Sequence, residues 1–534
     1  METPTDKEGG DDTSSAESRA IPSPVAPPPS PVGWAMAGFA RRELGHTATP
    51  AAKQPAAAPA AVVNQSVSTA ADSPLGNPEQ IAAEKAATET VNTLPVQLMK
   101  VVLKVGWLAT AHSEFSEVGG PDQENLAQLS RAVDEYAMAA AFQQQLLNPM
   151  TPNAVMQVAP PHTWYHQSVG GSRILYDNPD TIYRFMPVNK TSTYVINVRF
   201  EENAEPADVT FSLLTGLSGT TADVLTKDQL VPNPDGSYTI YVSGAPPEPG
   251  QDNHLQLTSD STLIAVRDTL SDWNTQQPMT MSIQRISGPP NSLFSQLGGF
   301  AIPLIGPAVT DSPALTTLVS LIPPLADPPP LLRGAVTAVV MALGLSMERE
   351  YIRVATVDPT TGERRQPNVL TNPTRNAEFL ATQMQSAGYF QLADDQALVV
   401  TIDPGDAGYF TVPVTNDWTI TNNYWDQQTS LNIDQAIENP DGTYTIVISP
   451  TDPGVENWVS TGGLNQGTIS IRFQDLPSEP GTQPTVSSQL VSLDQLEDAL
   501  PPGTRTDVTE QERQEHIALR KAGFNKRFAP FAQP

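Results

Sequence analysis

Two acidic side chains, Asp177 and Asp180, stand three positions apart in the stretch "YDNPDTIYR". Paired carboxylates can act as general acid and base, or they can hold a divalent metal ion. The same residue types also fix turns before a strand, since Asp and Asn side chains bond their own backbone. Asp177 and Asp180 are therefore the catalytic candidates of a hydrolase hypothesis, with turn formation as the alternative.

A second group of chemically capable residues follows Asn422. Amide side chains donate and accept hydrogen bonds, tryptophan offers a flat apolar surface, and arginine offers a planar fork of donors. Together they suit a sugar or a carboxylate. The alternative is that they fix loops and that the tryptophan fills a core. The ligand-binding candidates are Asn423, Tyr424, Asn432, Asn457, Trp458 and Arg472.

Other catalytic motifs are weak or missing in the sequence. His162 and His166 have the H-x3-H spacing of some metal ligands, but they lie in the loop-like stretch "PPHTWYHQ" without a third histidine nearby. The sequence has no G-x-S-x-G elbow, no P-loop and no G-x-G-x-x-G that opens a helix after a strand. We therefore predict no metal site and no cofactor.

Composition excludes further classes of function. The chain has 534 residues, a formal net charge of −29 and no cysteine. The negative charge disfavours nucleic acid, and disulfides and cysteine-ligated metals are impossible. Residues 1–20 contain no apolar segment of the kind a secretory signal needs. The 52 prolines indicate long irregular connections.

The positions of the candidates depend on a repeat. "NPDGSYTIYVSG" begins at Asn233 and "NPDGTYTIVISP" begins at Asn439. Each copy reads as a tight Asp-Gly turn followed by a strand. The likeness continues through "EPGQDNHLQL" and "DPGVENWVST", which places His254 opposite Trp458 and Arg267 opposite Arg472. We therefore expect two related β-units in tandem.

The rest of the chain is expected to be helical or irregular. Segments rich in alanine and proline bury too little apolar surface to offset the entropy lost on folding, so they are expected to be disordered. Helix formers with apolar residues at three- and four-residue intervals predict helices, and short runs of alternating apolar and polar residues predict strands. The expected fold is mainly β with helical additions (α+β), built on two tandem β-sandwich or jelly-roll domains. A helix is expected near residues 373–387, and the capping box of Thr509 and Glu512 predicts a terminal helix. The expected parts are a disordered tail at 1–76, a helical lead-in at 77–170, the first β-unit at 171–286, an apolar helical insertion at 287–388, the second β-unit at 389–476 and a tail with a terminal helix at 477–534.

The insertion is poor in charge. No charged residue occurs from Ile286 through Thr310, and after Asp311 none occurs until Asp327. Prolines divide this run into pieces shorter than the roughly 20 apolar residues that a membrane span needs. A soluble helical insertion is the favoured interpretation. Contact with a membrane or a protein partner through residues 287–346 is the alternative.

The second β-unit resembles the bacterial domain of unknown function 1214, which often accompanies a domain of type 1254. The resemblance rests on "LADDQALVVTIDP", "NNYWDQQTSLN", "NPDGTYTIVIS", "DPGVENWVSTGG" and "GTISIRF". The first unit is more loosely similar, through "YDNPDTIYRFMPVNKTSTYVI" and "VRDTLSDW". The resemblance implies an architecture of paired β-domains and no reaction. A further stretch, "PVGWAMAGFARREL", resembles an element of many actinobacterial exported proteins and implies an envelope or secreted location.

Three functional hypotheses follow from the sequence. The first is an exported or envelope-associated protein that binds a small polar molecule or glycan, of carbohydrate or lipid origin, at the second β-unit or between the units. The second is a hydrolase that uses Asp177 and Asp180. The third is a scaffold that contacts a membrane or a partner through residues 287–346.

Overall fold

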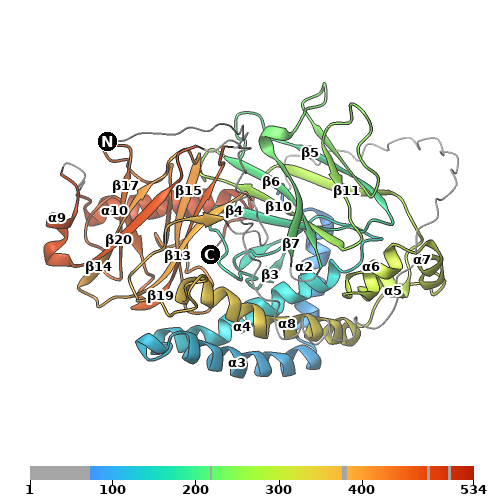
Figure 1. Ribbon diagram of the computed structural model, residues 1–534, viewed down its shortest axis with the longest axis horizontal. Coiled ribbons are helices and arrows are strands. Elements are labelled where there is room, and N and C mark those ends of the chain that lie inside the picture. Colours follow the sequence, from blue (N-terminus) through green and yellow to red (C-terminus); the bar gives the residue numbers. More distant parts are fainter. Residues whose placement is uncertain (1–72, 217–218, 376–381, 478–480, 503–506, 534) are drawn as a thin grey trace, which may run out of the picture. The chain divides into compact units, whose positions relative to one another are not determined.

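The computed structural model describes residues 73–216, 219–375, 382–477, 481–502 and 507–533 (Figure 1). All of these residues belong to the second of two units into which the chain divides, residues 57–534. Of the tail predicted to be disordered at 1–76, residues 1–72 lie outside the described residues, and so does the "PVGWAMAGFARREL" stretch.

The N-terminal helices begin where the sequence places capping residues. The Asn77 side chain accepts a hydrogen bond from the Gln80 amide, and Asp122 accepts one from the Asn125 amide, so each satisfies an amide of the first helical turn. In the predicted lead-in at 77–170, helices occupy residues up to Gln145, and the described residues after them form short strands from Val155 to Val169. The helices are α2 (Pro78–Val91), α3 (Leu94–Glu114) and α4 (Gln123–Gln145).

The first β-unit is a sandwich of two antiparallel sheets with one parallel edge pair. One sheet has the order β1-β4-β10-β6-β7 and the other β11-β5-β8-β9, with a core of apolar side chains from both. A separate hairpin pairs β2 (His162–Trp164) with β3 (Gln167–Val169). The strands of the sandwich are β1 (Val155–Met156), β4 (Thr181–Pro187), β5 (Thr193–Arg199), β6 (Asp208–Thr215), β7 (Thr220–Thr226), β8 (Tyr238–Ser243), β9 (His254–Gln256), β10 (Ser261–Thr269) and β11 (Thr280–Ser287).

The second β-unit repeats this topology strand for strand. Its sheets have the orders β12-β13-β19-β15-β16 and β18-β17-β14-β20, and its own apolar core lies between them. The mainly β fold with helical additions is therefore confirmed. The strands are β12 (Thr374–Arg375), β13 (Met384–Gln391), β14 (Gln396–Asp403), β15 (Tyr409–Thr415), β16 (Ser430–Asn432), β17 (Tyr444–Ser449), β18 (Trp458–Ser460), β19 (Gln466–Gln474) and β20 (Thr485–Ser492).

One local prediction is wrong. A helix is expected near residues 373–387, and of these the described residues 374–375 and 384–387 belong instead to β12 and to the first part of β13. Pairing of β13 with β19 along the whole strand outweighs the local preference of residues such as Met384 and Gln385 for a helix. The strands of the second β-unit consequently extend from Thr374 to Ser492, beyond the expected 389–476.

The two β-units meet through equivalent positions. The Thr269 hydroxyl on β10 donates to Gln474 on β19, which lies 205 residues later in the chain. Burial lowers the pKa of Arg267 to about 10, and the positive charge of Arg472, at the equivalent place on β19, acts in the same direction. Contact between matching positions of two copies is the mark of an approximate two-fold arrangement.

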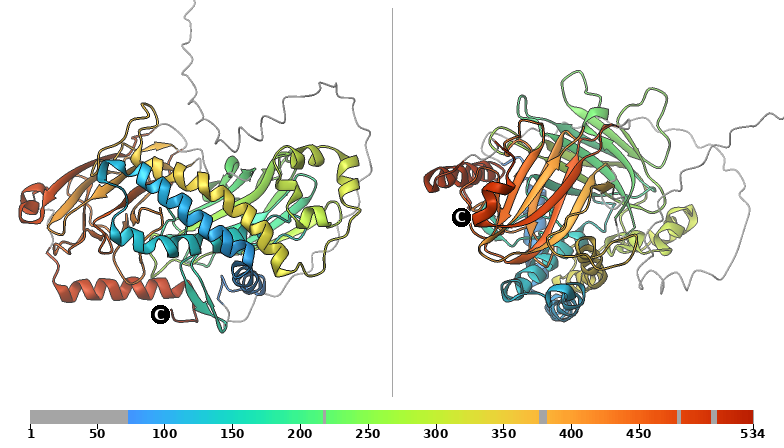
Figure 2. Two further views of the ribbon diagram at one scale, coloured as in Figure 1. Left: turned by 90° about the horizontal axis from the view of Figure 1, so that it is seen from below. Right: turned by 60° about the vertical axis from the view of Figure 1, so that its left-hand side comes forward.

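Helices cover one side of the paired sandwiches (Figures 1 and 2). α8 packs against α2, α3 and α4, and it also contacts β13 and β19. The Trp107 indole of α3 donates to the Gly344 carbonyl of α8 at 2.9 Å. Between the β-units the chain forms α5 (Leu293–Gln296), the 3-10 helix η3 (Gly299–Ala301), α6 (Ile305–Thr310), α7 (Pro313–Val319) and α8 (Pro330–Thr356).

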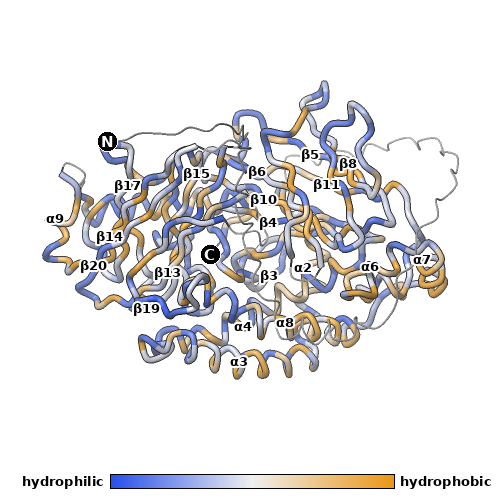
Figure 3. The backbone as a smooth tube through the Cα atoms, in the orientation of Figure 1, coloured by the Kyte–Doolittle hydropathy of each residue, from blue (hydrophilic) through white to orange (hydrophobic). Residues whose placement is uncertain are grey.

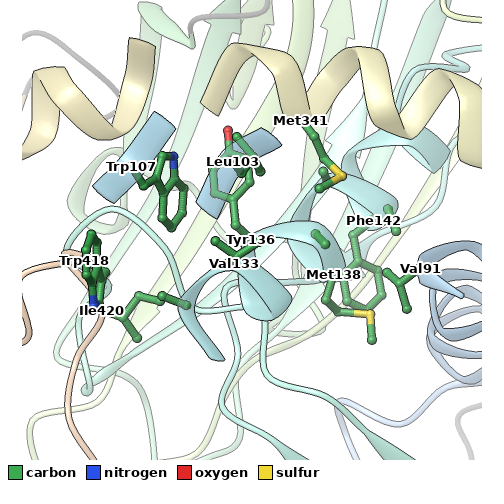
Figure 4. Close-up of a cluster of buried hydrophobic side chains, with 14 of the residues drawn as sticks. Val91, Leu103, Trp107, Val133, Tyr136, Met138, Phe142, Met341, Trp418 and Ile420 are labelled. Atoms are coloured by element: carbon green, nitrogen blue, oxygen red, sulfur yellow. The ribbon is translucent and has the colours of Figure 1, made fainter. Parts of the chain in front are cut away.

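A single apolar core joins the helices to both β-units (Figure 4). Trp107, Tyr136 and Met341 come from α3, α4 and α8, and Trp418 comes from the loop after β15.

At the other end of the chain, α9 (Leu496–Ala499) is followed by α10 (Glu510–Lys526), which starts at the predicted capping box of Thr509 and Glu512.

Candidate functional site

The two acidic candidates are buried and fully engaged. Asp177 accepts the Thr421 amide at 3.1 Å and the Thr421 hydroxyl at 2.5 Å. Asp180 accepts the Trp273 indole at 2.8 Å and the Tyr409 hydroxyl at 2.6 Å. Both carboxylates therefore connect the first β-unit to residues of the rest of the fold, which is what a structural role requires.

Burial changes the acidity of Asp177. Loss of water raises its pKa to about 6, although the Arg173 guanidinium and the bonds from Thr421 act in the opposite direction. Arg173 itself forms a two-point pair with Glu135 of α4, at 2.9 Å and 2.5 Å, and donates to the Thr421 carbonyl at 2.9 Å. This network holds α4, the 173–180 loop and the second β-unit together.

Tyr424 and Asn432 lie at the junction of the β-units with α10. The Tyr424 ring packs edge-on against Trp273, Trp425 and Phe524, with ring centres 6.1, 5.2 and 6.0 Å apart. The Asn432 amide donates to the Ser271 carbonyl of the first β-unit at 2.9 Å. Asn423 accepts the Asp426 amide, three residues on, at 3.2 Å, a local bond that fixes the loop.

Asn457 has the same role in the second β-unit that Asn253 has in the first. Asn457 accepts the Ile437 amide at 2.7 Å and donates to the Ile437 carbonyl at 2.7 Å. Asn253 makes the same pair of bonds with Val231, at 2.8 and 2.7 Å. A ligand specific to the second unit would not explain this match, whereas a shared loop anchor does.

Trp458 and His254 are likewise equivalent. The Trp458 indole donates to the Ser449 hydroxyl at 3.0 Å, and a ring nitrogen of His254 lies 3.1 Å from the Ser243 hydroxyl. The Arg513 guanidinium of α10 lies 5.0 Å from the centre of the Trp458 ring. The tryptophan is thus covered by the terminal helix, and its flat surface is used within the protein.

The six ligand-binding candidates therefore lie in three places. Asn423, Tyr424 and Asn432 are at the junction with α10, Asn457 and Trp458 are at the β17–β18 edge, and Arg472 is on β19 near Arg267. Two cavities stand out among the described residues, with volumes of about 10 and 20 Å³. Of the six ligand-binding candidates, Tyr424 lines the larger cavity and the other five line neither. Neither volume accommodates a sugar.

Residues that sequence reasoning did not single out complete the junction. The guanidinium groups of Arg520 and Arg527 lie 4.3 and 4.4 Å from the centre of the Trp273 ring. Arg520 bonds the Tyr424 carbonyl and the Ser430 hydroxyl. No spacing in the sequence links a terminal helix to a tryptophan about 250 residues earlier. Only the occurrence of Trp273 in "VRDTLSDW" draws attention to it.

A different feature stands out on the surface of the helical layer. Large aliphatic side chains are exposed on α3, on the segment from η3 to Leu325, and on α8. Figure 3 colours much of these helices as hydrophobic. Figures 1 and 2 show that this segment lies near one end of α8. We call the surface the apolar face: Leu94, Leu98, Val101, Val102 and Val105 of α3; Ile302, Leu304, Ile305, Leu315, Leu318, Leu321, Ile322 and Leu325; and Leu331 and Val339 of α8.

Helical geometry concentrates the exposed side chains of α3 on one side. Leu94, Leu98, Val101 and Val105 recur at intervals of three and four residues, while Leu103 and Trp107 point into the core. Leu98 and Val101 are 60% exposed and Val105 is 67% exposed. An exposed aliphatic stripe of this length is unfavourable in water, and it marks a surface that meets an apolar partner.

The charges near the apolar face are few and mostly paired. Within Leu94–Ala111 the charged residues are Lys100 and Lys104, Asp311 lies in the segment that follows η3, and the part of α8 from Leu331 to Val339 adds Arg333. Lys100 lies 3.2 Å from Asp134, and Arg333 lies 2.9 Å from Glu89. With these partners counted, the face is close to neutral in a chain with a net charge of −29.

Two described helices, α3 and α8, are long and apolar enough to cross a membrane by length and composition. In each, 22% of the most apolar window is buried, whereas the core helix of a globular protein would be mostly buried. The prolines that divide the apolar run of the insertion into short pieces lie before α8, and α8 itself is an uninterrupted helix of 27 residues.

The comparisons agree with the repeated β architecture. A family model described as "Protein of unknown function (DUF1214)" matches residues 215–267 and 381–477, one region in each β-unit, which supports the DUF1214 family. A crystal structure of an uncharacterised protein from Burkholderia cenocepacia is similar in fold, with a TM-score of 0.56 and 20% identity. The match covers 76% of this chain and 99% of that one.

A Vibrio parahaemolyticus protein matches with a TM-score of 0.33 and 13% identity, over 59% of this chain and 90% of that one. Among curated proteins, none matches this sequence. The family model thus supports two DUF1214-like β-units, and none of the comparisons carries a reaction.

Proposed function

We propose that this protein docks on a phospholipid surface through its apolar face and that the two β-units form the scaffold that carries that face. The observation that supports the proposal is the aliphatic stripe Leu94, Leu98, Val101 and Val105, exposed on α3 beside the exposed residues of α8. α3 and α8 pack directly against each other.

Lipid explains the composition of the face better than a protein partner does. Protein interfaces are enriched in tyrosine, tryptophan, phenylalanine, methionine and arginine. The large hydrophobic side chains of the apolar face are leucine, isoleucine and valine. Aliphatic residues flanked by lysines are the pattern of helices that lie in the boundary of a bilayer. Lys104 favours anionic headgroups, whereas the charge of Lys100 is paired with Asp134.

The free energy gained when lipid covers these aliphatic side chains is large enough for reversible binding to a membrane. Full burial of an aliphatic side chain contributes about 1.5–3 kcal/mol, so Leu98, Val101 and Val105, each about two-thirds exposed, contribute about 1–2 kcal/mol apiece when lipid covers them. Together they contribute ~3–6 kcal/mol, which corresponds to a change of at least ~100-fold in the partition coefficient.

The test is flotation of the full chain with vesicles of phosphatidylcholine and phosphatidylglycerol at a 3:1 ratio. We expect the wild-type chain to float with the vesicles and the triple variant Leu98→Ser, Val101→Ser, Val105→Ser to remain behind. Pure phosphatidylcholine is expected to bind more weakly, because each lysine near an anionic surface contributes ~1 kcal/mol.

The matched control is the triple variant Val231→Ser, Val369→Ser, Leu490→Ser, which removes exposed aliphatic side chains from outside the apolar face. It should float like the wild type. If the wild type stays behind, or if both triple variants lose binding to the same extent, docking through the apolar face is wrong.

An envelope or exported location and a companion domain of type 1254 stay predictions. Docking on lipid is compatible with such a location. Binding of a polar carbohydrate- or lipid-derived ligand by the Asn423–Arg472 candidates also stays a prediction. The contacts of Asn457, Trp458 and Asn432 within the protein give it no support, so we favour the lipid surface.

A further inference from the structure

The end of α10 places a cation in the interior of the protein. Arg527 caps the helix and is 4% exposed. Its guanidinium lies above the Trp273 ring and 5.8 Å from the centre of the Phe524 ring. An aromatic surface attracts a cation, but it accepts no hydrogen bond in the plane of the guanidinium.

Two nitrogens of Arg527 lack a partner. Within the described residues, neither Nε nor Nη2 is bonded, although both are buried. A buried, unbonded donor on a charged group is costly, by about 1–3 kcal/mol or more. Such a group therefore indicates a ligand that the protein atoms alone do not supply.

The charge balance at the junction points to the sign of that ligand. Arg520 and Arg527 are both buried, and their bonds within the described residues go to neutral groups or are unmade. Burial lowers the pKa of both arginines, and the negative charge of Asp180 acts in the opposite direction on each. The Asp180 oxygens accept hydrogen bonds from Trp273 and Tyr409. Two buried cations thus share one carboxylate, and an uncompensated buried charge is unfavourable.

A cavity lies beside Arg527. Its volume is about 20 Å³, and its lining includes Arg527, Tyr424, Thr181 and Tyr183 together with apolar side chains. A cavity of about 10–15 Å³ is already enough for one water-sized occupant. The hydroxyl groups of Tyr183 and Tyr424 are further donors that an anion can use, whereas the Thr181 hydroxyl is engaged with Thr269.

We infer that this cavity binds a single small monovalent anion, of the size of chloride, against the unbonded edge of Arg527. The anion would complete the charge balance of the Arg520–Trp273–Arg527 stack. It would also secure the end of α10 and the following residues, where the Gln533 side chain bonds the Thr163 backbone of the β2–β3 hairpin at 2.7 and 3.0 Å. This inference is independent of the lipid proposal.

The first experiment is a bromide soak of crystals of the full chain. Bromide replaces chloride and is located by its anomalous scattering. We expect a peak within hydrogen-bond distance of Arg527 Nη2 or Nε, inside the cavity. Density at that point without anomalous signal would mean a water molecule and would overturn the inference.

The second experiment is a comparison of Tm in sodium chloride and in sodium gluconate at equal ionic strength, because an ion that binds the folded state raises Tm. We expect a rise of ~2 °C in chloride for the wild type and for the control variant Arg199→Gln, whose side chain is exposed. Arg527→Gln should show no rise. Equal Tm values in both salts for the wild type would refute the inference, and this comparison holds even if Arg527→Gln does not fold.

Discussion

The equivalence of Asn253 and Asn457 makes a quantitative prediction about stability. Each side chain bonds the amide and the carbonyl of one loop residue, Val231 or Ile437, at 2.7–2.8 Å. A hydrogen bond contributes a net ~1 kcal/mol, so Asn457→Ala should lower the free energy of unfolding by ~1–2 kcal/mol. Asn457→Ala should also leave the affinity for any ligand unchanged, because the Asn457 side chain is already hydrogen-bonded to the loop at Ile437.

Asn253 differs in its backbone. Its φ of +51° lies in the left-handed region, where alanine is strained by ~1–2 kcal/mol and asparagine and glycine are tolerated. Asn253→Ala should therefore cost more than Asn457→Ala, and Asn253→Gly should recover most of the difference. Urea unfolding, followed by tryptophan fluorescence, measures all three variants against the wild type.

The result that would refute this reasoning is specific. If Asn457→Ala unfolded at the wild-type urea concentration while Asn253→Gly was destabilised, Asn457 would not be a loop anchor. Its side chain would then be available for the ligand role that the sequence suggested.

Two further predictions concern the buried network around Arg173. Arg173→Met should lower the free energy of unfolding by ~3 kcal/mol or more, because it leaves Glu135 charged and unpaired in the interior; urea unfolding measures this. Burial raises the pKa of Asp177 to about 6, so its contribution to stability is complete below pH ~4 and is lost as pH rises through 6, a loss of roughly 3 kcal/mol by pH 7. Tm measured from pH 4 to pH 7 should fall less steeply for Asp177→Asn than for the wild type, and parallel curves would contradict the assignment.

The β architecture could be predicted from the sequence because its signals are local. The Asn-Pro-Asp-Gly turns carry their own hydrogen bonds: Asn233 donates to Ser237 and Thr239, and Asn439 donates to Thr443 and Thr445. Turn chemistry of this kind does not depend on distant residues. The helix expected near 373–387 failed for the opposite reason, since β13 exists only through its pairing with β19 about 80 residues later.

The apolar face could be predicted in part. The low charge of residues 287–326 was visible in the sequence, and so was the helical character of 94–111. Which side of α3 is exposed depends on contacts with α8, such as Trp107 with Gly344, and no local pattern contains that contact. α3 is apolar on both its buried and its exposed sides, so periodicity alone could not separate them.

The repeat also explains why the ligand candidates separate in space. In a tandem repeat, residues that each copy needs for its own loops recur at equal spacing, as Asn253 and Asn457 do. Residues specific to the pairing of the copies need not recur: β10 presents Thr269 where β19 presents Gln474, and the two bond each other. The exposed residues of α3 and α8 and the residues of the α10 junction are not part of the repeated loop anchors, and these are the residues on which both proposals rest.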